Sequence, residues 1–234
     1  MIDSMREQLE SFSEEDYKKF NEKIVPGAAN MLGVRLPKLR QLAKMAAKKE
    51  PEVYLNSIEE ALSMNKDDVY YEEIMIYGFV IGYAKFTDEE RRRWLDQFIC
   101  HIDNWAICDS CCMTYKWMKK NPEYWWDYLL SCIDKNQEYT IRVAVVCMLG
   151  HFIDDRYVEQ VLEWCNQIQH EGYYVKMAVA WAVSVCFVKY SELTYQFLQE
   201  NQMDDFTQNK AIQKICDSYR VTKEVKKKVK QLKR

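Results

Sequence analysis

The sequence predicts an all-α fold, and three observations support this prediction. The 234 residues include only six Gly and four Pro, whereas an all-β chain needs turn residues at roughly every 8–12 positions. Apolar side chains recur at helical spacing, as in Leu36, Leu39, Ala43 and Ala46. With 48% apolar and 29% charged residues, the chain has both a core and a solvated surface, which excludes general disorder.

Start signals and apolar periodicity divide the chain into helices joined by short connections, as is typical of antiparallel helical neighbours. Pro37 marks the start of the helix that carries the first apolar stripe, and Pro51 opens the next helix. The helices that follow are expected over residues 67–85, 88–102, 104–120, 122–132, 139–152, 156–170, 173–189, 191–199 and 205–219, before a basic last helix.

An internal repeat appears when the chain is shifted by 34 residues, because segments 141–147, 175–181 and 209–215 then superpose. The shift places Arg142, Lys176 and Lys210 on one another, each near the start of a helix that follows another helix. Since one helix pair cannot bury its apolar face alone, such pairs stack. We therefore predict an α-solenoid of HEAT-like helical repeats, an α-α superhelix.

The domain expected from this repeat is a single one over residues 1–234, with a basic C-terminal helix or tail at 220–234. The longest apolar run, 143–150, is far shorter than the roughly 20 residues that span a bilayer, and the acidic N-terminus has no apolar signal region. We expect a cytoplasmic protein with no membrane contact, whose nine Cys are reduced thiols.

The net charge of −3 conceals two basic stretches. Residues 220–234 carry eight basic side chains and one acid, and residues 31–49, which include Arg35 and Lys38, carry six basic side chains and no acid. Segregated charge of this kind is compatible with an anionic partner contacted at selected points. The simpler alternative is that a Lys-rich terminal helix only keeps the protein soluble.

The segment with the clearest chemical potential begins at Trp105. Because Asp109 lies four residues later, the two share one helix face, where a ring and a carboxylate together would stabilise a cation. Arg142 would hold a phosphate by a bidentate contact, and Trp181 would approach the same surface. The structural alternative is a core Trp and a capping Asp. Asp103, which precedes the helix, is interpreted as a cap.

Two weaker patterns have structural interpretations. The motif Cys108-x2-Cys111 has no second pair at a spacing that suits zinc, so we expect these thiols to be buried and predict no metal or other cofactor. The adjacent Trp125 and Trp126 are expected in the core between repeats.

The constellation of Trp105, Asp109, Arg142 and Trp181, with the segments MLGVRLPKLRQLAK and WAVSVCFVK, resembles the DNA alkylation repair family of AlkD-like DNA glycosylases. The resemblance covers about residues 20–219. It implies a HEAT-like solenoid that holds double-stranded DNA in a basic concave groove. It also implies excision of cationic alkylated purines, of the 3-methyladenine and 7-methylguanine type, without a cofactor.

Carried over to this chain, the resemblance makes Asp109 the catalytic carboxylate, with Trp105 and Trp181 against the sugar. Arg142 would contact a phosphate, and we expect a monomer that binds alkylated or distorted duplex DNA. The DNA-binding surface would also include the basic residues Lys176, Lys210, Arg35 and Lys38.

Two other functions compatible with the sequence are a catalytically silent relative that binds bent or branched DNA and a repeat scaffold for protein partners. The chain departs from the active members at Ala106, Ile107 and Ser184, and also in its N-terminal helix pair, which is acidic at its start and broken by Pro26-Gly27. The recurrence of Arg142, Lys176 and Lys210 in one register favours the two DNA-binding hypotheses over the scaffold.

Overall fold

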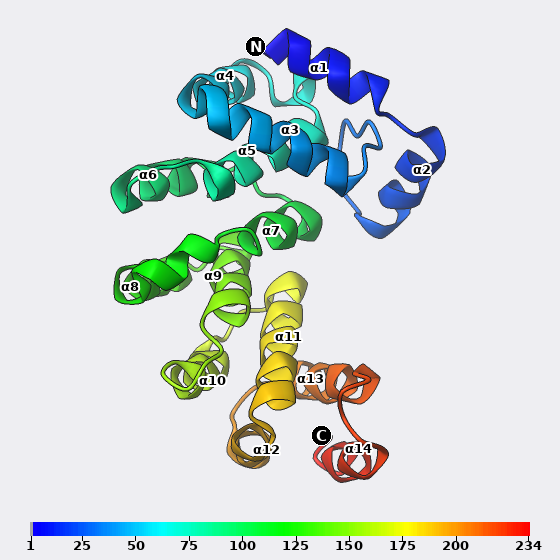
Figure 1. Ribbon diagram of the computed structural model, residues 1–234. Helices are drawn as coiled ribbons and strands as arrows, with labels where there is room; N and C mark the ends of the chain where they lie inside the picture. Colours follow the sequence, from blue (N-terminus) through cyan, green and yellow to red (C-terminus); the bar gives the residue numbers. More distant parts are fainter. Residues whose placement is uncertain (1) are drawn as a thin grey trace. The chain divides into compact units, whose positions relative to one another are not determined.

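The computed structural model describes residues 2–234, with side chains from residue 4 onward (Figure 1). Over these residues it has fourteen α-helices, two 3-10 helices and no strand, which confirms the predicted all-α fold. The chain divides into two compact units, Met1–Lys116 and Trp117–Arg234. Beside this division, the expectation of one repeat domain over the whole chain stays a prediction.

The first unit is built of seven α-helices in its described part, with one 3-10 turn between α4 and α5. These elements are α1 (Ile2–Ser11), α2 (Glu15–Ile24), α3 (Leu36–Lys49), α4 (Pro51–Met64), η1 (Lys66–Asp68), α5 (Tyr71–Tyr83), α6 (Asp88–Ile99) and α7 (Trp105–Cys112). Helices α3 and α7 both pack against α5, and α4 and α6 pack on it from outside.

The second unit follows a 3-10 helix, η2 (Lys116–Lys120), and repeats the same arrangement. Its helices are α8 (Pro122–Asp134), α9 (Glu138–His151), α10 (Val158–Gln167), α11 (Tyr173–Lys189), α12 (Ser191–Glu200), α13 (Asp205–Asp217) and α14 (Lys223–Lys230). Helix α11 packs between α9 and α13, and these three contain the three superposable segments. The predicted stack of two-helix repeats is therefore present in this unit.

The inner helices are buried on all sides because they have neighbours on several sides. In α5, every residue from Tyr71 to Ile81 is buried, and α9 is buried from Thr140 to Leu149. Helices α5 and α7 approach each other closely at Gly78, where an added Cβ would collide with Cys111 Sγ of α7. Trp125 and Trp126 of α8 are also buried, as predicted.

One predicted helix, over residues 104–120, is wrong in its second half. Helix α7 ends at Cys112, and η2 follows after a turn. The carbonyl of Ser110 would accept the next helical N–H, but it receives the Thr114 hydroxyl at 3.0 Å and the Arg40 guanidinium at 3.3 Å instead. Side-chain donors at a carbonyl compete in this way with helix continuation.

The predicted helix over residues 67–85 starts four residues late in the structure, at Tyr71. Asn65 accepts the N–H of Asp67 and so starts the separate 3-10 turn η1. Helix α5 then begins with its own box, in which the Glu73 carboxylate accepts the N–H of Tyr70 at 2.9 Å. The helix over 173–189 is confirmed at both ends.

A buried carboxylate of α5 holds the long connection between α2 and α3. Glu72 is fully buried and accepts the backbone N–H groups of Leu32, Gly33 and Val34 at 3.0, 2.8 and 3.2 Å. Burial raises the pKa of this carboxyl, and the three N–H donors act in the opposite direction. Gly33 has a φ of +87°, a conformation that glycine adopts without strain.

Removal of this carboxylate is expected to destabilise the protein. The change Glu72→Ala leaves three buried N–H groups without an acceptor, so the free energy of unfolding should fall by about 2 kcal/mol or more. Urea denaturation measures the change, with Glu60→Ala at an exposed position of α4 as the charge-matched control. Equal midpoints for the two variants would contradict the anchoring role.

Candidate nucleic-acid interface

Helix α7 exposes a Trp–Asp pair and buries most of its remaining side chains. Trp105 and Asp109 are partly exposed, as is the neighbouring Ser110. The buried residues of α7 are Ala106, Ile107, Cys108, Cys111 and Cys112. The predicted shared face of Trp105 and Asp109 is therefore present, and the alternative of a core Trp does not hold at this position.

The start of α7 is fixed by a cap that the sequence interpretation placed one residue too early. Asn104, not Asp103, is the N-cap, and its side-chain oxygen accepts the N–H of Ile107 at 3.0 Å. Asp103 instead accepts from Lys66 Nζ at 2.8 Å and from the Asn104 amide at 2.9 Å. Asp103 thus holds the capping side chain rather than capping the helix itself.

The indole of Trp105 is tied to the end of α2. Its Nε1 donates to the carbonyl of Ile24 at 3.1 Å. This bond fixes one end of the ring while part of its surface stays accessible. The end of α2 therefore helps to set the orientation of the ring.

Three positions at which the sequence departs from the family that it resembles are buried. Ala106 and Ile107 lie on the inner side of α7, and Ser184 of α11 is also buried and donates to the carbonyl of Trp181 at 2.7 Å. These three side chains thus pack beside the candidate residues.

The thiols beneath Trp105 and Asp109 are packing groups. Cys108, Cys111 and Cys112 are fully buried, and burial raises the pKa of the Cys111 thiol well above its ordinary value. Across the described residues, no group of three or more His, Cys, Asp or Glu side chains could hold a metal ion. The thiols are therefore buried, as the sequence interpretation expected.

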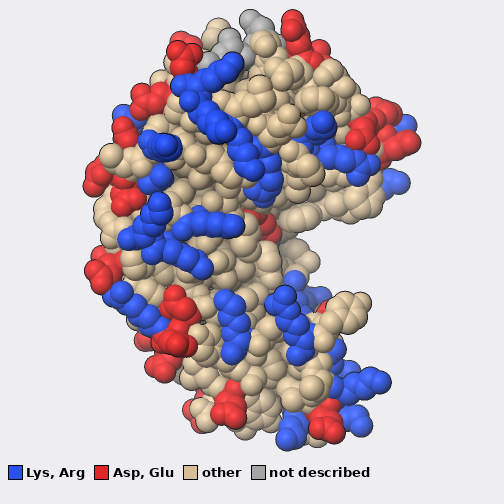
Figure 2. Space-filling model, in the orientation of Figure 1, with Lys and Arg blue, Asp and Glu red and all other residues tan. Residues whose placement is uncertain are grey.

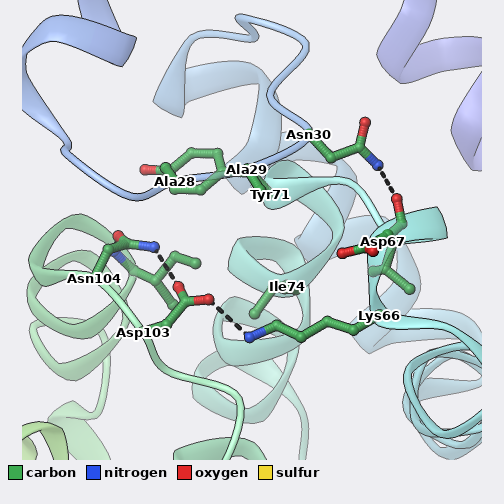
Figure 3. Close-up of a pocket in the computed structure, with 11 residues that line it drawn as sticks. Ala28, Ala29, Asn30, Lys66, Asp67, Tyr71, Ile74, Asp103 and Asn104 are labelled. Carbon is green, nitrogen blue, oxygen red and sulfur yellow. Dashed lines mark hydrogen bonds and ion pairs between the residues drawn. The ribbon is translucent and has the colours of Figure 1, made fainter.

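A hollow of about 320 Å³ lies at the start of α7, and no sequence motif indicated it (Figure 3). The connection around Asn30, the turn η1 and the first turn of α5 line it together with Asp103 and Asn104. Its polar groups bond to one another, as when the Asn30 amide donates to the Asp67 carbonyl at 3.0 Å. We therefore assign it to the support of α7.

In the first unit, the predicted DNA-binding cations at the start of α3 contact groups of the protein. Arg35 forms an ion pair with Glu14 at 2.8 Å, and its guanidinium lies over the ring of Tyr17. This neighbour lowers the pKa of the Glu14 carboxyl. Lys38 Nζ lies 4.6 Å from the centre of the Phe12 ring.

Arg40 is a cation that our sequence analysis did not single out, although it belongs to the basic stretch at 31–49. Its guanidinium donates to the Tyr83 hydroxyl at 2.8 Å and to the Ser110 carbonyl, and it lies over the ring of Phe79. It therefore links α3 to the last turn of α7. In Figure 2, Lys and Arg side chains form a row along α3.

In the second unit, Arg142, Lys176 and Lys210 lie in the early turns of α9, α11 and α13. Arg142 is only 5% exposed, and its Nη1 donates to the Tyr174 carbonyl at 2.6 Å. Aromatic rings lie beside these cations. Among them, Tyr139 stacks on Tyr174 with centroids 5.5 Å apart. The repeat thus places the cations in register, with the first of them largely covered.

The other two cations are more accessible. Lys176 Nζ lies 3.0 Å from Glu171 Oε2 and 3.8 Å from Asp204 Oδ1, and the bond to Glu171 chiefly raises its pKa. Lys210 Nζ lies 3.5 Å from Gln213 Oε1. Trp181, on the same helix as Lys176, is partly exposed.

The cap of α7 offers a test of how the Trp–Asp pair is positioned. The change Asn104→Ala removes the acceptor for the Ile107 N–H, so the free energy of unfolding should fall by about 1–2 kcal/mol. Thermal and urea denaturation measure it against Asn56→Ala, an exposed position within α4 where the change should stay within about 0.5 kcal/mol. An Asn104→Ala variant as stable as this control would rule out the capping role.

Comparison with known proteins identifies one family. The sequence model of the family described as DNA alkylation repair enzyme matches residues 5–215. No curated protein matches the chain. Among the described helices, none is long and apolar enough to cross a membrane.

Proposed function

The chain belongs to the DNA alkylation repair enzyme family, and on this premise we propose that it is a DNA N-glycosylase specific for cationic alkylated purines in duplex DNA. The family indicates an enzyme of DNA repair that interacts with DNA. The proposal adds the reaction, hydrolysis of the N-glycosidic bond, and the substrate class, purines such as 3-methyladenine and 7-methylguanine.

The observation that carries this proposal is the surface of α7. Its inner side is buried against α5, while Trp105 and Asp109 are accessible one helical turn apart. A carboxylate beside an aromatic face is suited to a cation, because the full charge and the ring quadrupole both attract it. Such a positive charge develops on the sugar when a purine is lost.

In the proposed reaction, the bond between C1′ and the purine nitrogen breaks and its electron pair neutralises the alkylated base. Asp109 stabilises the positive charge that develops on the sugar, as carboxylates do for oxocarbenium-like sugars in glycoside hydrolysis. Water adds to C1′ and releases its proton, which leaves free base and an abasic site. Because the base departs as a neutral molecule, no general acid is needed.

The remaining candidates bind the substrate in this proposal. Trp105 and Trp181 contact the sugar beside the lesion, and Arg142 contacts a phosphate. The DNA backbone is contacted by Lys176, Lys210, Arg35 and Lys38. Each of them would exchange a protein partner for a phosphate. The protein acts as a cytoplasmic monomer without a cofactor.

The proposal predicts that Asp109→Asn reduces release of methylated purine by about 100-fold or more, because a neutral amide cannot stabilise the sugar cation. The measurement is chromatographic detection of free base from methylated duplex DNA, with DNA affinity measured in parallel. Asp127→Asn, at an exposed position of α8, removes a carboxylate outside α7 and serves as the control, with release unchanged.

The outcomes separate the three functions. Release that persists in Asp109→Asn would reject Asp109 as the catalytic carboxylate. No release by the unaltered protein, with DNA retained, would identify the silent relative that binds bent or branched DNA. Neither release nor binding would leave the protein scaffold.

A further inference from the structure

The basic C-terminal segment is an ordered helix rather than a loose tail. Helix α14 begins at a Thr222 cap, whose hydroxyl accepts the Val225 N–H at 3.3 Å. Val229 is fully buried, and Cys216 Sγ of α13 lies 3.9 Å from the Lys226 carbonyl. The helix thus packs on α13 through an apolar side.

Buried polar contacts fix the residues that follow α14. Gln208 of α13 is fully buried, and its Nε2 donates to the carbonyls of Leu198 and Leu232 at 3.0 Å each. The Arg234 guanidinium donates to the carbonyls of Met203 and Asn201 at 2.7 Å each. Because both ends of the segment are held, its lysines have defined positions.

Packing segregates the charges of α14. Lys223, Lys227 and Lys230 are exposed, and their helical spacing places them along one side, away from Val229. Glu224 and Lys228 lie four residues apart on another side of the helix. Figure 2 shows Lys and Arg side chains gathered over this region, at the lower right.

The cationic side of α14 follows a hollow that contains Trp181. This hollow, of about 430 Å³, is lined by three bases, Lys189, Lys214 and Arg220, and one acid, Asp217. Arg220 lies in the connection from α13 to α14, beside Tyr219, which is fully exposed. Bases therefore continue along the chain from the rim of the hollow to Lys230.

We propose that Arg220 and the Lys223–Lys227–Lys230 side of α14 bind the phosphodiester backbone of one DNA strand next to the hollow at Trp181. The inference deepens the proposed function, and it rests on DNA as the partner. From Lys223 to Lys230 the helix rises about 10 Å, so the row is long enough to contact more than one phosphate of a strand. A row of separate cations fits a polyanion better than a single small anion.

The test compares two neighbouring lysines on the same helix. Lys227→Ala and Lys228→Ala change the net charge equally and both alter exposed side chains, but only Lys227 lies in the proposed row. Affinity for a fluorescent duplex is measured over a range of salt concentrations. We expect the plot of log affinity against log salt concentration to become less steep by about 0.9 in Lys227→Ala, as for one lost phosphate contact. The slope should be unchanged in Lys228→Ala.

A second variant tests whether the helix must be held in place. Gln208→Ala keeps every lysine but removes the anchor to Leu232, so the slope should fall although the charge is unchanged; circular dichroism checks that the variant is folded. Equal slopes for Lys227→Ala and Lys228→Ala would overturn the inference.

A measurement of base release distinguishes this inference from the glycosylase proposal. DNA binding with the expected slopes but no base release would support the inference and reject only the glycosylase. Failure of the unaltered protein to bind DNA would reject both.

Discussion

The burial of the inner helices is the constraint on which the rest of each unit depends. Helix α5 contacts α3, α4, α6 and α7, so its middle has no accessible side and its polar residues must serve internal purposes. Glu72 holds the connection before α3, and Glu73 forms an ion pair with Arg6 at 2.8 Å. Functional groups are therefore confined to helix ends, to connections and to helices with fewer neighbours. Helix α7 is of the last kind, which is why a Trp and an Asp are accessible on it.

Local sequence was sufficient to predict most of the helices and the repeat. Residues 173–189 form an inner helix that ends before Tyr190, and periodicity alone located both of its ends. The prediction for α7 was wrong at its end, where the Ser110 carbonyl accepts from the Thr114 hydroxyl and, across 70 residues of sequence, from the Arg40 guanidinium. The interval of 34 placed Arg142, Lys176 and Lys210 in register, but it could not indicate that Arg142 is almost completely covered.

The candidate site was predictable in the same partial way. The spacing of Trp105 and Asp109 fixes a shared face on any helix, and the structure has that face. The acceptor of the Trp105 indole, the carbonyl of Ile24, comes from α2 and depends on how the chain folds back. The ion pair of Arg35 with Glu14 joins α3 to the start of α2 for the same reason. Such partners follow from tertiary packing, which periodicity does not encode.

The cations differ in what they already contact. Arg35 and Lys176 are neutralised by carboxylates of the protein, whereas α14 has one acid, Glu224, among its lysines. A cation that leaves a protein carboxylate to bind a phosphate releases fewer condensed counterions in net terms. Phosphate contacts at Arg35 and Lys176 would therefore depend less steeply on salt concentration than those at α14.

The three thiols beneath the Trp–Asp face allow the local opening of α7 to be measured by cysteine labelling. Cys108, Cys111 and Cys112 are fully buried, and an inaccessible thiol does not react with alkylating reagents. Because Cys111 lies against Gly78 of α5, a labelling event at Cys111 would record an opening of α7 away from α5. Cys100, which is exposed, would react in the closed state and serve as an internal reference for the labelling rate. The dynamics of the candidate site are thus accessible to mass spectrometry without any engineered probe.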